Sequence, residues 1–119
     1  MIIDDSRVQR ALLKGLLLAE GYQVVEAVSG TLALDHLQHD HNFDLILLDI
    51  LMPEINGMQT LYLIKNNPLT ASIPVMMLTG VKGESEEKQA LGLGASSYAK
   101  KSASMMAVIN LVKEQLAGT

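Results

Sequence analysis

Apolar and polar positions along the chain form two alternating kinds of segment. Short runs rich in aliphatic residues predict buried strands, and longer stretches with apolar residues three and four apart predict helices. The strands are expected at residues 1–4, 23–27, 44–49, 73–78 and 97–100. Because a helical stretch follows each of them, the pattern is a strand and a helix repeated five times.

Capping residues and helix breakers mark the expected helix ends. Ser6 and Gln9 are spaced as a capping box before the first helix, and Gly21 is suited to end it. The apolar face of this helix is expected to contain Val8, Ala11, Leu12, Gly15, Leu16 and Ala19. The other helices are expected after a cap at Ser29 to residue 38, after Gly57 to residue 66, and over residues 84–91 and 103–116. The segment 84–91 has few apolar anchors and should be the most loosely held.

Strands that alternate with helices favour a parallel sheet covered by helices on both faces. Eight such units would be needed for a barrel, whereas five leave an open sheet whose ligands collect at the carboxyl ends of the strands. With 119 residues, 49% of them apolar, the chain is expected to form one domain over residues 1–119.

Composition excludes several functions. The chain has no cysteine, which removes disulfides, thiolate nucleophiles and cysteine-ligated zinc. A net charge of −4 and a pI near 5.2 argue against direct nucleic-acid binding. No apolar run approaches the roughly 18 residues needed to span a bilayer. We therefore expect a cytoplasmic protein that does not insert into a membrane.

Polar side chains follow the ends of several predicted strands. Asp49 comes directly after the aliphatic run 45–48 and before a turn segment, so its carboxylate should emerge at the rim of the sheet. The residues expected at the same rim are Asp4, Asp5, Asp49, Thr79, Lys100 and Lys101. Each alone is ordinary for a turn or a helix cap, but together they form a group that the fold does not require.

Three carboxylates in one place need a cation, and Mg²⁺ prefers carboxylates, water and phosphate oxygens as ligands. The negative charges of three carboxylates balance the positive charges of one Mg²⁺ ion and one lysine. This arrangement suits phosphoryl transfer to a carboxylate, and Asp49 is the best candidate nucleophile because it lies on the central strand. Thr79 would then donate a hydrogen bond to a phosphoryl oxygen.

Four motifs resemble the receiver domains of two-component response regulators: DDS at residues 4–6, DILMPEING at 49–57, LTG ending at Gly80, and GASSYAKK at 94–101. They cover nearly the whole chain in the right order. The resemblance implies the flavodoxin-like receiver fold, an α/β fold with strand order 2-1-3-4-5 and five flanking helices.

The resemblance also implies a role for each residue. Asp49 is similar to the phospho-acceptor, and Asp5 and Asp49 to direct ligands of Mg²⁺, or of Mn²⁺ as the alternative ion. Asp4 would act mainly through water, and the backbone carbonyl of Leu51 would complete the protein's ligands. The remaining family positions are the phosphate-sensing pair, Thr79 and Lys101, and the aromatic switch, Tyr98.

Two departures from the family pattern have consequences. Ser102 stands where the family usually has a proline preceded by a cis bond, and a cis bond before serine would cost about 2.5 to 4 kcal/mol, so a trans Lys101–Ser102 bond is expected. Leu51 and Val81 occupy positions that modulate loss of the phosphoryl group. Because neither can orient a water molecule, self-dephosphorylation is predicted to be slow.

The function implied is a phosphorylation-dependent signalling switch. It would accept a phosphoryl group from a histidine kinase or phosphotransfer protein and alter binding of an unidentified downstream protein through the face of helix four, strand five and helix five. The only catalysis expected is of its own phosphorylation and dephosphorylation. The alternative is a phosphorylation-independent interaction module on the same fold.

Other interpretations are weaker. A haloacid-dehalogenase-type hydrolase normally needs a second aspartate where Leu51 stands, and the segment SRVQR after strand one is not a flavin phosphate loop. His36, His39 and His41 are expected to be solvated residues near a helix end, since no second shell is visible for a metal site. Without the family match, Tyr98 would be an ordinary strand aromatic.

Overall fold

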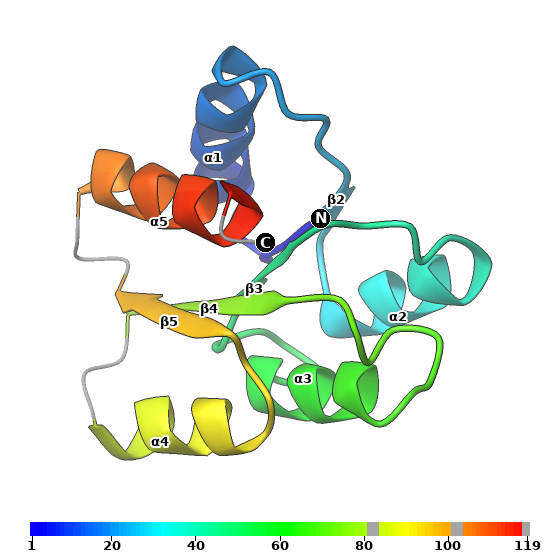
Figure 1. Ribbon diagram of the computed structural model, residues 1–119. Helices are drawn as coiled ribbons and strands as arrows, with labels where there is room; N and C mark the ends of the chain where they lie inside the picture. The colour runs from blue at the N-terminus through cyan, green and yellow to red at the C-terminus, as the bar shows by residue number, and fades with distance from the viewer. Residues whose placement is uncertain (81–83, 101–103, 118–119) are drawn as a thin grey trace.

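The computed structural model describes residues 1–80, 84–100 and 104–117 as a twisted sheet between two layers of helices (Figure 1). The sheet has five strands in the order β2-β1-β3-β4-β5, and every neighbouring pair is parallel. Helices α1 and α5 cover one face, and α2, α3 and α4 cover the other (Figure 1). The expected fold is thereby confirmed.

Every predicted strand and helix is present. The strands are β1 (Ile2–Ile3), β2 (Glu26–Ala27), β3 (Ile46–Asp49), β4 (Val75–Thr79) and β5 (Ser97–Lys100). The helices are α1 (Arg7–Ala19), α2 (Gly30–His39), α3 (Gly57–Lys65), α4 (Glu84–Gly92) and α5 (Met105–Ala117). Among these helices, as far as the structure describes them, none is long and apolar enough to cross a membrane. β2 is shorter than predicted because it is an edge strand that pairs only with the two residues of β1.

The central strands are buried on both faces, which explains their aliphatic runs. Alternate residues of each strand point to opposite sides. Ile3, Leu48 and Met77 belong to the core cluster under α2 and α3. Their neighbours Ile2 and Leu47 belong to the cluster under α1 and α5. The sheet therefore separates two apolar cores.

The predicted apolar face of α1 is wrong at five of its six positions, and only Leu16 is partly buried against the core. Val8 is 70% exposed and Leu12 is 51% exposed, whereas Leu13 and Leu17 are buried against the sheet. The helix is rich in leucine on more than one side, so its periodicity allows two different faces. In α5, Val108, Ile109 and Val112 are buried, whereas Met106 is exposed.

Caps begin and end the helices largely as expected. Ser6 Oγ accepts a hydrogen bond from Gln9 N at 3.2 Å, and Gly21, with φ of +89°, follows the end of α1. The reciprocal capping box that we expected at the start of α1 is instead complete at α3. There Asn56 Oδ1 accepts from Gln59 N at 3.0 Å, while Asn56 N donates to Gln59 Oε1 at 2.9 Å.

Candidate functional site

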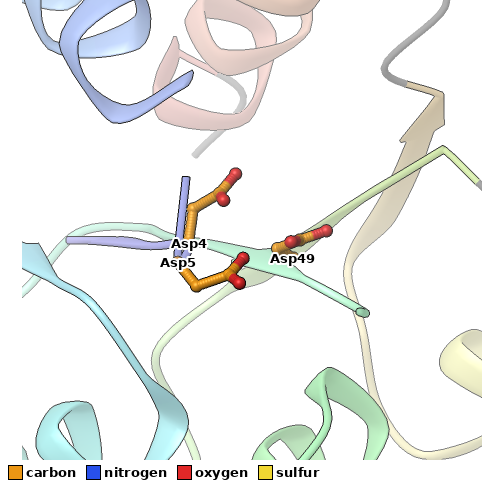
Figure 2. A group of neighbouring side chains, drawn as sticks. All are labelled: Asp4, Asp5 and Asp49. Atoms are coloured by element: carbon orange, nitrogen blue, oxygen red, sulfur yellow. The ribbon is translucent and has the colours of Figure 1, made fainter. Parts of the chain in front are cut away.

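The carboxyl groups of Asp4, Asp5 and Asp49 gather at the carboxyl ends of β1 and β3 (Figure 2). Each offers an oxygen, and these oxygens all lie within 4.8 Å of one another. Asp4 is 1% exposed and Asp49 is 4% exposed, whereas Asp5 is exposed to solvent. In the part of the chain that the structure describes, this is the one group of three or more acidic or histidine side chains close enough to share a metal ion.

The start of α3 packs directly against the end of β3 and fixes the position of the Asp49 backbone. Gly57 N donates to Ile50 O at 2.7 Å, closing the loop between the two elements. A Cβ on Gly57 would collide with the Asp49 carbonyl oxygen and lie 2.6 Å from Ile50 Cα. Only glycine therefore allows this close approach. In the same loop Glu54 has φ of +66°, and its carboxylate accepts a hydrogen bond from Thr31 Oγ1 at 3.2 Å.

Asp4 is held in the turn between β1 and α1 by contacts on several sides. Its backbone N donates to Ala27 O at 3.2 Å, and its Oδ1 accepts from Ser6 N at 2.8 Å. Arg10 Nη1 donates to the Asp4 carbonyl oxygen at 2.7 Å. Arg10 is not recognisable as a site residue from the sequence, because no periodic signal links it to a carbonyl six residues earlier.

Thr79 and Tyr98 lie on the neighbouring strands β4 and β5, with Tyr98 two residues before the position that pairs with Thr79. Thr79 is the last residue of β4 and is fully buried. Tyr98 on β5 pairs with Met77 and is half-buried against the core under α3. The pKa of Tyr98 is raised above its ordinary value, mainly because the side chain is partly desolvated. The carboxylates of Glu86 and Glu87 on α4 also raise this pKa, whereas the hydrogen bond with the Thr79 side chain lowers it. The predicted sensing hydroxyl and aromatic switch are therefore neighbours.

Some residues of the predicted site are not described by the structure. Lys101, Ser102 and Val81 lie outside the described residues, so neither the sensing lysine nor the Lys101–Ser102 bond is tested. Lys100 is exposed and pairs with Thr79 in the sheet register. Leu51 is exposed just beyond Asp49.

The donor set fits a hard divalent cation. Carboxylate oxygens suit Mg²⁺ or Mn²⁺, whereas zinc and copper sites normally use histidine or cysteine ligands. Two nearly buried carboxylates beside a third repel one another, and a bound divalent ion would remove that repulsion. Asp4, Asp5 and Asp49 are the residues that would hold it.

Fold and site together define an open parallel α/β protein with a cluster of three acidic side chains where its central strands end. A family model described as the response regulator receiver domain matches residues 1–113. The chain belongs to this receiver domain family.

Individual relatives agree. The chain is 42% identical over 101 residues to the transcriptional regulatory protein CpxR of Escherichia coli (strain K12), covering 85% of this chain but only 41% of CpxR. It is 32% identical over 116 residues to the polar-differentiation response regulator DivK of Brucella ovis, covering 98% of this chain and 94% of DivK.

Solved structures show the same likeness. One is the signal receiver domain of a signal transduction histidine kinase from Syntrophus aciditrophicus, with a TM-score of 0.88, 31% identity, and coverage of 99% of this chain and 89% of that chain. Another is a CheY-like receiver domain protein from Methanospirillum hungatei, with a TM-score of 0.89, 26% identity, and coverage of 98% and 91%. Receiver domains are phosphorylation-dependent signalling switches that bind Mg²⁺ at an acidic pocket.

Proposed function

We propose that residues 1–119 act as one receiver domain that accepts a phosphoryl group on Asp49 from a histidine kinase or a phosphotransfer protein. The observation that supports this most directly is the grouping of Asp4, Asp5 and Asp49 within 4.8 Å, at the end of the sheet where Thr79 also lies. A structural role alone does not require nearly buried carboxylates at the same place.

The chemistry follows from the nucleophile and its neighbours. A carboxylate oxygen of Asp49 attacks the phosphorus of a phosphohistidine; a P–O bond forms, the P–N bond breaks, and the electron pair returns to the imidazole nitrogen, which takes up a proton. When bound, Mg²⁺ offsets the negative charge of the acids and the phosphoryl group. Asp5 and Asp49 would hold that ion directly, with the carbonyl of Leu51, and Asp4 would act mainly through water. Thr79 and Lys101 would donate to the phosphoryl oxygens.

The signal would leave the site through Thr79 and Tyr98. Movement of the Thr79 hydroxyl toward a phosphoryl oxygen removes a neighbour of the tyrosine hydroxyl, and the ring can then turn toward the core under α3. This would shift the population of the α4–β5–α5 surface between two states and change how it binds a downstream protein. The half-buried position of Tyr98 beside Thr79 supports a coupling between these two residues.

Intact-mass measurement after incubation with acetyl phosphate and Mg²⁺ tests the proposal. We expect a gain of about 80 Da for one phosphoryl group. The gain should be absent in Asp49→Asn and when EDTA replaces Mg²⁺, but present in Asp35→Asn, which makes the same chemical change at an exposed acid on α2. A gain that survives in Asp49→Asn would place the phosphoryl group elsewhere. No gain in the wild-type protein would favour the phosphorylation-independent interaction module.

A further inference from the structure

Arg10 connects α1 to β2 and to the turn after β1, beside the three acidic residues. Its Nη1 donates to the carbonyl oxygen of Asp4 at 2.7 Å, and its Nε lies 3.3 Å from Glu26 Oε1 on β2. The side chain is only 13% exposed, so it lies within the structure rather than in solvent. One turn later on α1, Lys14 Nζ reaches the other carboxylate oxygen of Glu26 at 3.3 Å.

The carbonyl that Arg10 holds lies between two of the candidate metal ligands. It belongs to the peptide group that joins Asp4 to Asp5, and a peptide group is planar. A short charge-assisted hydrogen bond to this oxygen therefore restricts rotation of the whole plane, and with it the directions in which the two side chains leave the backbone. The Asp4 carboxylate is held separately by Ser6 N at 2.8 Å.

The geometry of the contact requires arginine. The guanidinium is a rigid planar fork, so Nη1 can bind a carbonyl while Nε faces a carboxylate. Glu26 is paired with Ile2 in the sheet, and its carboxylate fixes the orientation of the fork. A lysine has a single nitrogen on a flexible stem and cannot hold both partners in this geometry.

We infer that Arg10 is a positioning residue for the divalent-cation site: braced by Glu26, it orients the Asp4–Asp5 peptide so that both carboxylates face the ion. This inference rests on the proposed metal-dependent function and adds a residue to it. Arg10 itself carries a positive charge and does not bind the ion.

The sign of the effect separates positioning from simple electrostatics. A nearby positive charge repels a divalent cation, so removing it should strengthen Mg²⁺ binding if charge alone mattered. Removing a positioning contact should weaken binding, because the carboxylates then have to be ordered when the ion binds. The two explanations predict opposite changes.

The experiment compares Arg10→Gln with Arg7→Gln, which removes the same charge from an exposed position on the same helix. Mg²⁺ affinity is measured by isothermal titration calorimetry at a temperature where every variant is folded. We expect Arg10→Gln to weaken Mg²⁺ binding about tenfold, the lower end of what loss of an outer-shell partner costs. Arg7→Gln should leave the affinity unchanged or slightly stronger. Glu26→Gln and Arg10→Lys should weaken binding less than Arg10→Gln.

A second measurement uses the metal-free protein. Amide hydrogen exchange of Ser6, whose N–H is bonded to the Asp4 carboxylate, should be faster in Arg10→Gln than in wild type and unchanged in Arg7→Gln. Equal or tighter Mg²⁺ binding in Arg10→Gln would overturn the inference. If wild type binds Mg²⁺ but gains no phosphoryl mass, the proposed function fails while the Arg10 comparison still stands; if wild type does not bind Mg²⁺, both fail.

Discussion

Single residues decide how closely the elements approach at this site. Gly57 is the clearest case, because the start of α3 packs directly against the backbone of Asp49 and Ile50. The acidic side chains are the groups that would react or bind a metal. Gly57, which has no side chain, allows α3 to begin directly behind Asp49 at the end of β3.

We predict that Gly57→Ala lowers the free energy of unfolding by about 1 to 3 kcal/mol, because the added methyl group must displace backbone. Urea denaturation followed by circular dichroism measures this change. Gly15→Ala on α1 is the matched control, since a Cβ there meets nothing within 4 Å. It should stabilise the protein by about 0.5 to 1 kcal/mol. Equal effects of the two substitutions would contradict the close-packing account.

Much of the site could be predicted at the residue scale, and some could not. The local pattern of apolar residues predicts four of the site residues, because each comes after an apolar run and so at a strand end: Asp4, Asp5, Asp49 and Thr79. Arg10 was missed because its partners are a backbone carbonyl and Glu26, sixteen residues away. Neither contact leaves a periodic trace in the sequence.

At the scale of elements, the helices differ in how firmly they are held. α3 buries Met58, Leu61 and Ile64 against the sheet and has a complete capping box. α4 has the sequence ESEEKQALG, and Ala90 is the one buried residue among its described side chains. Apolar burial is the main source of helix stability in a folded domain. Because α4 buries fewer apolar side chains than α3, its packing against the sheet stabilises it less.

We therefore expect the backbone amides of α4 to exchange with solvent at least about tenfold faster than those of α3 through local opening. Hydrogen–deuterium exchange followed by NMR would compare both helices in one sample. Leu91→Ala, a change at an exposed α4 position, should leave the rates of both helices unchanged. Similar protection in α3 and α4 would refute the expectation, and would also weaken the argument that the α4 surface is the one that responds to phosphorylation.

At the scale of the whole molecule, folding brings negative charges together that the unfolded chain keeps apart. The protein carries a net charge of −4, and three of its acids meet within 4.8 Å. Their mutual repulsion opposes folding, and a ligand that binds only the folded state offsets it.

Mg²⁺ should consequently raise the midpoint of thermal unfolding, whereas EDTA should lower it to the metal-free value. At a Mg²⁺ concentration one hundred times its Kd, the stabilisation is about 2.7 kcal/mol. Differential scanning calorimetry measures the shift, and Asp5→Asn should reduce it. The same Mg²⁺ series on Asp35→Asn provides the control. A midpoint that does not respond to Mg²⁺ would count against a metal centre at these three residues.

The sequence by itself determined the succession of strands and helices, the polar residues at the strand ends and the family, because these depend on local periodicity, turn residues and motifs. Only the tertiary structure decided which face of α1 is buried and that Arg10 reaches the Asp4–Asp5 peptide. A leucine-rich helix satisfies the period with more than one face, and the rotation it adopts is selected by packing against strands that are distant in the chain.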